Sequence, residues 1–400
     1  MTMYKEKKNC ICCDSSDLSL LLDLNEQPLA NSYHDNTTKL QEYPLGVNLC
    51  NNCFHVQLTH IVNPDLLFKD YLYVSGTSKT LKDNFEWFSD FVLEYAPKCD
   101  SVLDIACNDG SQLDCFKSRG VSETYGVDPA ENLYEISSAN HTVVCDYFDD
   151  DIFNRTFDVI TAQNVFAHNE NALKFLNDCS SIMHDDSLLF IQTSQAEMIQ
   201  NNQFDTIYHE HISFFNINSM NELGKRSNLN LIDIIKTPVH GISYLFVFSK
   251  KELNNHLVQN LIDVEAQRGL LSKKLYSEYQ TNVNSVVEDF KKVITQYRAN
   301  GYTVIGYGAA AKGMTFLNFA QTSLDVIIDD NPLKQNLYTP GTNTIIKPAE
   351  YIKTYSKNEK LLFVPLAWNF YDEIRTRISK QRQNANDRFL KYFPNVKIEE

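Results

Sequence analysis

The sequence predicts an α/β protein with a small cysteine-rich module at its start and two doubly wound sheets after it. Three observations support this fold class. Paired cysteines lie near the start, strand-like apolar runs alternate with helical stretches from about residue 100 to 247, and the alternation returns after residue 301. Alternation of this kind is typical of doubly wound sheets. We expect four segments: residues 1–75, 76–249, a helical connector at 250–300, and 301–400.

Length and composition limit the possible functions. A chain of 400 residues is too long for one ordinary core. A net charge of −15 argues against nucleic acid as a partner, because such proteins present a basic surface. Apolar runs such as "LSLLLDL" are too short to cross a membrane, and "MTMYKEKKNC" contains no secretory signal. All ten cysteines lie at or before Cys179, a distribution typical of metal ligands and free thiols. We expect a cytoplasmic monomer with no membrane partner.

Two C-x-x-C pairs predict a zinc site in the first segment. Cys10 and Cys13 form one pair, and Cys50 and Cys53 form the other. Four thiolates can surround a tetrahedral Zn²⁺, and four protein ligands close the coordination, so this zinc would be structural. Cys12 is the spare thiol, since adjacent residues rarely serve one small site. The alternative is a set of buried free thiols.

Acidic residues follow three consecutive strands of the first predicted sheet. In "VLDIACNDGSQL" an apolar strand ends at Asp104 and passes into a turn with Asn108 and Gly110. Asp128 ends the next strand in "YGVDPA", and Asp146 follows the third in "CDYFDD". An acid after the second strand can accept hydrogen bonds from both hydroxyls of a ribose. Asp146, after the third strand, is placed to contact the edge of an adenine. The glycines of a pyrophosphate-binding turn are absent. Helix caps and turns are the alternative role for these acids.

This arrangement resembles the S-adenosylmethionine site of class I methyltransferases. The strand end "FDVITAQNVFAHNEN" is similar to the segment that faces the reactive end of the cofactor in those enzymes. The resemblance therefore implies that Gln163 and His168 lie near the transferred methyl group. The alternative for His168 is a histidine that starts a helix.

The last segment contains a second candidate binding loop. In "IGYGAAAKGMTFLNF" a strand ends near Tyr307 and runs through small residues into a helix that opens with Lys312. Helix-start amides and a lysine favour an anion, although tight strand–helix packing explains the small residues equally well. The next strand closes with "IIDDNPLKQNLYTPGT", where Asp329 or Asp330 can hold a polar group and Lys334 a phosphate.

Several motifs, spread over nearly the whole chain, point to one family. They are the two C-x-x-C pairs, "VLDIACNDG", "GVDP", "NVFAH", "FDTIYHEHISFF", "HGISY", "GYGAAAKG" and "DDNPLKQNLYTPGT". Together they resemble the sugar C-methyltransferases that act on nucleotide-linked keto-deoxysugars. The resemblance implies a zinc-binding N-terminal module, a central class I methyltransferase sheet, and a C-terminal Rossmann-like domain that helps to hold the nucleotide sugar. Two positions depart from the family: Ile242 replaces a usual glycine, and Ala310 a usual proline.

The resemblance also assigns roles within "YHEH". Methyl transfer to carbon needs a carbanion, so the enzyme must supply a base and a partner for the enolate oxygen. Histidine suits the base because its ordinary pKa of about 6.5 lies near working pH. By resemblance His211 is the base, Tyr208 donates to the enolate or a sugar oxygen, and Glu210 orients the substrate or the imidazole. His209 is expected to point away from His211 and to be structural.

Further polar residues are expected to contact the nucleotide sugar. Tyr71 and Tyr73 in "YLYVSG" could line the site, with packing at a domain edge as the alternative. His240 and Ser243 in "HGISY" could touch the sugar or the phosphate. The full set of expected substrate contacts is Tyr71, Tyr73, His240, Ser243, Tyr307, Lys312 and Lys334.

We therefore expect a transferase that uses S-adenosylmethionine to methylate C3 of a nucleoside diphosphate-linked 4-keto-6-deoxysugar, in branched-sugar biosynthesis. An O- or N-methyltransferase on a related sugar is one alternative, because it would not need its substrate to enolise. A zinc-stabilised regulatory protein that binds nucleotides without turnover is another. A metal held by His209 and His211 is disfavoured, because a catalytic zinc needs three protein ligands.

Overall fold

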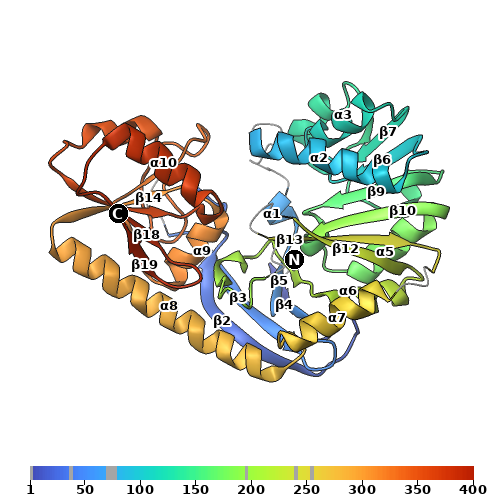
Figure 1. Ribbon diagram of the computed structural model, residues 1–400, viewed down its shortest axis with the longest axis horizontal. Coiled ribbons are helices and arrows are strands. Elements are labelled where there is room, and N and C mark those ends of the chain that lie inside the picture. Colours follow the sequence, from blue (N-terminus) through green and yellow to red (C-terminus); the bar gives the residue numbers. More distant parts are fainter. Residues whose placement is uncertain (1–2, 36–38, 69–78, 194–196, 238–241, 253–255) are drawn as a thin grey trace.

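The computed structural model describes residues 3–35, 39–68, 79–193, 197–237, 242–252 and 256–400. Two large sheets form separate bodies in Figure 1, and the strands of the N-terminal module and a long helix, α8, connect them below. This arrangement confirms the predicted α/β class. None of the helices in the described ranges has the length and apolar character required to cross a bilayer.

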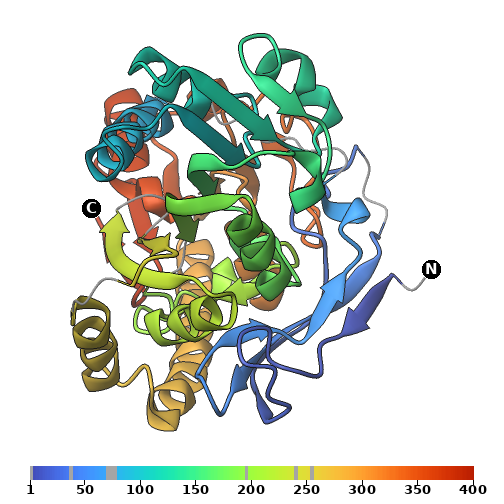
Figure 2. The same cartoon turned by 90° about the vertical axis from the view of Figure 1, so that its right-hand side faces the viewer.

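The N-terminal module is built on a four-stranded antiparallel sheet with the strand order β11-β4-β3-β2. The fourth strand, β11, comes from the middle of the chain, directly after "YHEH", and pairs Ser213 with Gln57 and Phe214 with Val56. In Figure 2, as in Figure 1, the blue N-terminal strands accordingly lie beside part of the green segment. The elements are β1 (Tyr4–Glu6), β2 (Leu18–Pro28), β3 (Glu42–Cys50), β4 (Val56–Leu58), β5 (His60–Val62), α1 (Asp65–Phe68) and β11 (Ser213–Phe214).

The middle domain contains a seven-stranded sheet with the order β12-β13-β10-β9-β6-β7-β8, in which β13 alone runs against its neighbours. Its strands are β6 (Ser101–Ile105), β7 (Glu123–Val127), β8 (Thr142–Val144), β9 (Phe157–Gln163), β10 (Met183–Thr193), β12 (Asn230–Thr237) and β13 (Ser243–Ser249). Its helices are α2 (Lys79–Tyr95), α3 (Ser111–Ser118), α4 (Tyr134–Ser137), α5 (Ala172–Ser181) and α6 (Ile217–Arg226).

Helices cover both faces of this sheet, which explains why its strands read as continuous apolar runs. Phe88 of α2 and Phe116 of α3 pack on one face, and Phe175 of α5 and Met220 of α6 belong to the core on the other. The chain leaves β6 for β7 on one side and later returns to β9 on the other side. The carboxyl ends of β6 and β9 therefore border the switch point where ligands bind in such sheets.

The connector consists of two helices rather than one continuous helical stretch. They are α7 (Leu257–Gln267) and α8 (Lys273–Ala299), and Gly269, with φ +86°, lies in the break between them. Helix α7 packs against the middle domain at α6 and β12, whereas α8 packs against β14 of the last domain and β2 of the N-terminal module. With 27 residues, α8 is about 40 Å long, so it spans the distance between the two large sheets.

The last domain contains a six-stranded sheet with the order β16-β15-β14-β17-β18-β19, parallel except for β19. Its switch point lies between β14 and β17, because the chain adds β15 and β16 on one side before β17 on the other. The elements are β14 (Tyr302–Tyr307), α9 (Ala311–Phe319), β15 (Val326–Ile328), β16 (Ile346–Lys347), β17 (Lys360–Pro365), α10 (Tyr371–Arg382), β18 (Arg388–Lys391) and β19 (Lys397–Glu399).

Candidate active site

The four cysteines of the C-x-x-C pairs form one cluster, with all sulfur atoms within 4.8 Å of one another. Sγ of Cys10 lies 3.6 Å from Sγ of Cys53, and Sγ of Cys13 lies 3.6 Å from Sγ of Cys50. Tetrahedral Zn²⁺ with bonds of about 2.3 Å requires sulfur separations of about 3.8 Å, so these residues fit the ion. Cys12 is fully buried and stands outside the cluster.

The "YHEH" residues form a tight turn rather than a strand, in which the His211 amide donates to the Tyr208 carbonyl at 2.9 Å. The next residue, Ile212, is fixed on both sides. Its amide donates to the carbonyl of Ala167 in the middle domain, and its carbonyl accepts from the amide of Leu58 in β4, both at 2.8 Å. The turn is therefore attached to two domains at once.

The side chain of His211 is held by a hydrogen bond at each ring nitrogen. Nδ1 lies 2.9 Å from the carbonyl oxygen of Thr206, and Nε2 lies 2.8 Å from the hydroxyl of Tyr208. A carbonyl oxygen can only accept, so Nδ1 carries the proton and the lone pair of the neutral ring is on Nε2. Tyr208 then donates to Nε2. The imidazole is 7% exposed, so its basic nitrogen is largely shielded from water.

Two further polar groups lie next to this base. The ring of His168 packs against that of His211 with 5.1 Å between centroids, and burial lowers the pKa of His168 to about 4, which keeps it neutral. Glu210 accepts from Nδ2 of Asn31 at 2.6 Å. Burial raises the pKa of Glu210 to about 7, although the bond from Asn31 and the charge of Lys334 oppose that rise.

His209 points to a different part of the structure from His211. Its Nε2 lies 3.3 Å from the carbonyl oxygen of Tyr43 in the N-terminal module, and burial lowers its pKa to about 4. The two histidines are directed to different partners from within one turn, residues 208–211. Neither metal-type cluster found among the described residues includes His209 or His211.

The predicted acids of the middle domain lie at the carboxyl ends of β6, β7 and β8. Asp104 is buried and accepts from the Thr161 hydroxyl of β9 at 2.6 Å, and burial raises its pKa to about 7. Asp128 accepts backbone N–H groups from Asn108 and Ala130, each at 2.9 Å, and burial raises its pKa too. Each carboxylate oxygen of Asp128 keeps a lone pair for a ribose hydroxyl.

The loop after β6 is tightly confined. Asn108 and Gly110 both have positive φ, at +50° and +82°, and a Cβ on Gly110 would lie 3.3 Å from Cα of Ser137. Asp146 is exposed and accepts from its neighbour's amide, while Gln163 donates to the Gln112 side chain at 2.9 Å. These residues thus lie after the carboxyl ends of neighbouring strands of one sheet.

Orphaned polar groups mark the same edge of the sheet. Gln192 of β10 is fully buried, yet its side-chain oxygen and nitrogen both lack a hydrogen-bond partner within the described chain, as does Oδ1 of Asn164. The two residues are neighbours, since the Asn164 amide donates to the Gln192 carbonyl at 2.9 Å. Unpaired buried amides are costly, so these groups fit a site that receives a polar ligand.

Lys334 of the last domain faces the "YHEH" turn. Its ammonium donates to the carbonyl of Ala309 at 2.8 Å and lies 4.9 Å from the ring centroid of Tyr33, whose hydroxyl donates to the same carbonyl at 2.5 Å. Burial lowers the pKa of Lys334, while the carboxylates of Asp329 and Glu210 oppose the change. The turn, the N-terminal module and the last domain therefore meet here.

Lys312 takes part in a second contact between domains. Its ammonium lies 4.8 Å from the ring centroid of Trp368, and Nε1 of Trp368 donates to Oδ2 of Asp205 at 2.7 Å. Burial raises the pKa of Asp205 to about 6, although the charge of Lys312 and the bond from Trp368 oppose that rise. Asp205 stands six residues before the base.

The remaining predicted substrate residues lie elsewhere or outside the described ranges. Tyr307 is directed to the Asp330 carboxylate, at 3.3 Å, and the guanidinium of Arg377 binds the same carboxylate at 2.5 Å. Ser243 is fully buried at the start of β13. Tyr71, Tyr73 and His240 fall in segments that the structure does not describe.

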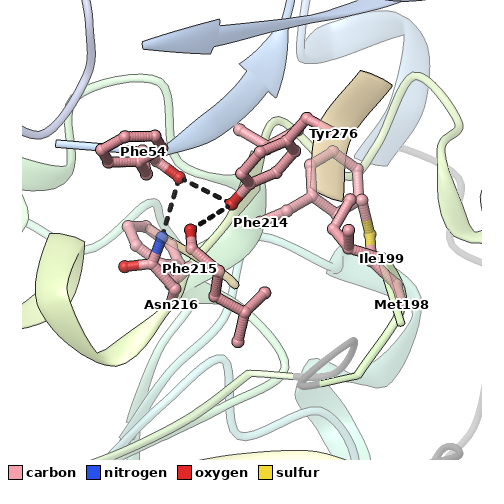
Figure 3. A pocket seen from close by; sticks show the side chains of 9 residues that line it. Phe54, Met198, Ile199, Phe214, Phe215, Asn216 and Tyr276 are labelled. Carbon is pink, nitrogen blue, oxygen red and sulfur yellow. Dashed lines mark hydrogen bonds between the residues drawn. The ribbon is translucent and has the colours of Figure 1, made fainter. Parts of the chain in front are cut away.

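A cavity beside the turn is too small for a substrate. Figure 3 shows it between Phe54, Asn216 and Tyr276, and its volume of about 20 Å³ suits no more than one water molecule. Nδ2 of Asn216 donates to the Phe54 carbonyl at 2.8 Å, and the Tyr276 hydroxyl lies 3.4 Å from the same oxygen. The cavity marks the place where the N-terminal module, α6 and α8 meet.

Several residues of the site were missed by reasoning from the sequence. They are Asn31, Tyr33, Gln192, Asp205 and Trp368. The two from the N-terminal module carry no motif signal, because long-range packing alone brings them to the turn. Asp205 was within the quoted "FDTIYHEH" stretch, so its position in that motif was the one available signal.

Comparisons with known proteins divide the chain into the same three parts. Residues 10–68 match a family described as a zinc binding domain, residues 79–234 a methyltransferase domain, and residues 238–394 a C-methyltransferase C-terminal domain. The chain is also 27% identical to the C-methyltransferase NovU of Streptomyces niveus, over 97% of this chain and 96% of that protein.

Solved structures give weaker likenesses. An S-adenosylmethionine-dependent methyltransferase from Clostridium acetobutylicum is 13% identical, with a TM-score of 0.33 over 42% of this chain and 92% of its own. CalS10, an amino pentose methyltransferase from Micromonospora echinaspora, is 12% identical, with a TM-score of 0.35 over 44% and 93%.

The matched domains and the site define a methyltransferase with an added zinc-binding module. More particularly, the chain combines the three matched domains and is similar over nearly its whole length to the C-methyltransferase NovU. The predicted family and the zinc module with its four cysteine ligands are thereby confirmed.

Proposed function

We propose that this protein uses S-adenosylmethionine to methylate C3 of a nucleoside diphosphate-linked 4-keto-6-deoxysugar, in the cytoplasm and for branched-sugar biosynthesis. The observation that carries the proposal is the fixed orientation of His211, whose Nε2 lone pair and Tyr208 partner lie at the junction of all three domains. An enolising C-methyltransferase needs one base and one hydroxyl donor side by side.

The base acts through one nitrogen. When the ketone binds, the Tyr208 hydroxyl would turn from Nε2 to the C4 oxygen, which frees the Nε2 lone pair. The proton of C3 then moves to Nε2 of His211, and the C–H electron pair becomes the enolate, whose charge is on the C4 oxygen. Nδ1 keeps its proton and its bond to the Thr206 carbonyl throughout. The resulting imidazolium is stabilised by that carbonyl, and the Tyr208 hydroxyl donates a hydrogen bond to the enolate oxygen while it accepts one from Nε2.

The cofactor would supply an electrophilic methyl group on a sulfonium. Asp128 would accept the ribose hydroxyls, the crevice beside Asp104 and Gly110 would hold the rest of the nucleoside, and Gln163 and His168 would line its reactive end. A neutral His168 adds no positive charge near the sulfonium. The methyl group that the cofactor supplies would bond to the carbanion at C3, and the electron pair of its bond to sulfur would stay on sulfur.

The last domain would hold the nucleotide part of the substrate. Lys312 and Lys334 carry the positive charge near its switch point, and both lie within reach of carboxylates on the "YHEH" side. A diphosphate can bind these lysines and the N-terminal amides of α9, whose first turn has no side-chain cap. The zinc ion plays no part in the chemistry, because its four protein ligands close its coordination.

The test is a deuterium-exchange experiment. Purified protein is mixed with dTDP- or GDP-linked 4-keto-6-deoxyhexoses in D₂O, with and without S-adenosylmethionine, and C3 is followed by NMR and mass spectrometry. We expect one new methyl group on carbon, lost in His211→Asn and kept in His256→Asn, a matched change at an exposed histidine. Methylation of oxygen or nitrogen without exchange at C3 would replace the proposal with the O- or N-methyltransferase, and binding without turnover would favour the regulatory alternative.

A further inference from the structure

One backbone carbonyl decides which nitrogen of His211 can act as a base. The Thr206 oxygen lies 2.9 Å from Nδ1, so it holds the proton there and leaves the lone pair on Nε2 beside Tyr208. If this carbonyl moved away, the proton could occupy Nε2 instead, and the nitrogen that faces Tyr208 would lose its basicity. The reactivity of His211 as a base therefore depends on the position of residues 204–206.

The last domain packs against this short helical turn (Phe204–Thr206). Phe204 is fully buried and stacks on Phe316 of α9, with 5.2 Å between ring centroids, and it meets Phe393 edge-on at 5.8 Å. Asp205, also fully buried, accepts from the indole N–H of Trp368 at 2.7 Å. Thr206 itself is 1% exposed, and its hydroxyl has no partner within the described residues.

Packing alone does not explain an acidic residue at position 205. Oδ1 of Asp205 has no hydrogen-bond partner in the described parts of the chain, while Oδ2 accepts from the indole N–H of Trp368. A buried carboxylate costs free energy that an apolar side chain of the same size would avoid. Lys312, over the face of the same indole at 4.8 Å, offsets part of that cost. What the bond to Trp368 does is fix the position of Asp205, the residue directly before Thr206.

We propose that Asp205 and Trp368 are positioning residues through which the nucleotide-binding domain sets the tautomer of the catalytic base. The chain of contacts runs from the Trp368 indole N–H to the Asp205 carboxylate, along one peptide unit to the Thr206 carbonyl, and on to Nδ1 of His211. Trp368 follows β17 at the switch point of the last domain, so a nucleotide bound there lies next to Trp368, where the chain of contacts begins. The consequence for turnover rests on the proposed function, whereas the tautomer itself does not.

Two variants test the link without removing any group that contacts the reacting atoms. Trp368→Phe keeps an aromatic ring over Lys312 but removes the N–H donor. Asp205→Leu keeps the volume of the side chain but removes the acceptor. The chain has one other tryptophan, Trp87, which is 39% exposed on α2, so Trp87→Phe is the matched control.

The first readout is the tautomer of His211, measured by ¹⁵N NMR on histidine-labelled protein without substrate, with His211→Asn used for assignment. We expect the Nδ1–H form in the wild type and in Trp87→Phe, and a mixture of both tautomers in Trp368→Phe and Asp205→Leu. We also expect kcat to fall about tenfold in both variants with KM unchanged, as for the loss of one hydrogen bond. The double variant should be no slower than either single variant, because both remove the same link.

Stability separates this role from a merely structural one. Asp205→Leu should unfold at a lower temperature than the wild type, because the Lys312 ammonium and the Trp368 N–H lose their carboxylate partner, and yet its kcat should remain low at temperatures where the variant is fully folded. The inference is overturned if both variants keep the Nδ1–H form, or if kcat returns to the wild-type value at temperatures where the variants are fully folded. If no protein methylates any sugar but the tautomer still shifts, the proposed function fails and the positioning role stands.

Discussion

Asp104 illustrates how burial sets the charge of a single residue at this site. Its carboxyl is buried in β6 with the Thr161 hydroxyl as its hydrogen-bond donor, and burial raises its pKa to about 7. The group therefore binds its proton more tightly in the folded chain than in the unfolded chain, where an aspartate has a pKa of about 3.9. This difference links the stability of the fold to pH.

Asp104→Asn should become more stable relative to the wild type as pH rises. A carboxyl with a raised folded pKa stabilises the fold below the unfolded pKa, and that contribution is lost between about pH 4 and pH 7. Asparagine does not titrate, so the difference in thermal midpoint between variant and wild type should grow up to about pH 7 and then level off. Exposed Asp263→Asn is the control. A difference that is constant from pH 5 to pH 8 would contradict the raised pKa.

The same variant should bind S-adenosylmethionine about tenfold or more weakly, because an amide cannot accept a cationic amino group as a carboxylate does. Isothermal titration at pH 8, where the wild-type carboxyl is ionised, measures the affinity. An unchanged affinity would place the cofactor elsewhere and leave Asp104 a purely structural acid.

The acids, cysteines and "YHEH" could be recognised in the sequence because each type of residue recurs at a spacing that its chemistry requires. Asn31 and Trp368 could not, because each makes one contact across domains and stands in no repeated pattern. Gln192 could not be predicted either, because nothing in the sequence distinguishes it from other polar residues near strand ends. Contacts between distant segments depend on how the domains pack, and that packing cannot be derived from a single sequence.

At the scale of elements, the two-residue strand β11 connects the zinc module to the turn that carries His211. It pairs with β4 alone in the four-stranded sheet, and β4 follows directly on the knuckle that holds Cys50 and Cys53. The cluster fixes this knuckle, the knuckle fixes β4, and β4 fixes the turn that carries His211. A structural metal can thus affect turnover without touching the substrate.

Cys50→Ser should lower kcat far more than it weakens cofactor binding. Loss of one ligand releases zinc and loosens β4, so the "YHEH" turn loses one of its two attachments, whereas the crevice beside Asp128 belongs to another domain. We expect a fall of at least about tenfold in kcat and a change of less than about threefold in the Kd of S-adenosylmethionine. Zinc content, turnover and cofactor affinity are measured together.

Cys12→Ala is the matched control for this experiment, because Cys12 is as buried as the ligands but outside the cluster. It should keep its zinc and its kcat. A Cys50→Ser protein that loses zinc but keeps its wild-type kcat would show that β11 holds the turn without help from the metal.

For the whole molecule, the predicted α/β class is confirmed, but the way in which the sheets meet was not predicted. The sequence indicated two sheets and a helical connector, because apolar periodicity reports on local structure. It did not indicate that the connector breaks at Gly269 or that the N-terminal module lies between the two sheets. Those features depend on contacts such as Tyr33 with Ala309, which join residues far apart in the chain.

Lys334→Met should separate the two binding events of the whole enzyme. The lysine serves the last domain and faces Glu210, so its loss should raise KM for the nucleotide sugar at least about tenfold. The Kd of S-adenosylmethionine should not change, because the cofactor crevice lies on another sheet. Lys347→Met, at a lysine bound to Asn336, is the control. Equal weakening of both ligands would mean that the variant disturbs the packing of the domains.

The late position of β11 in the chain also bears on how the protein is made. During synthesis the cysteines and strands β2 to β4 leave the ribosome long before residues 213–214, so the N-terminal sheet waits with the edge of β4 unpaired. The nascent module can bind its metal early, yet it completes its sheet when most of the middle domain has already emerged. The first module to be synthesised is therefore among the last to be finished.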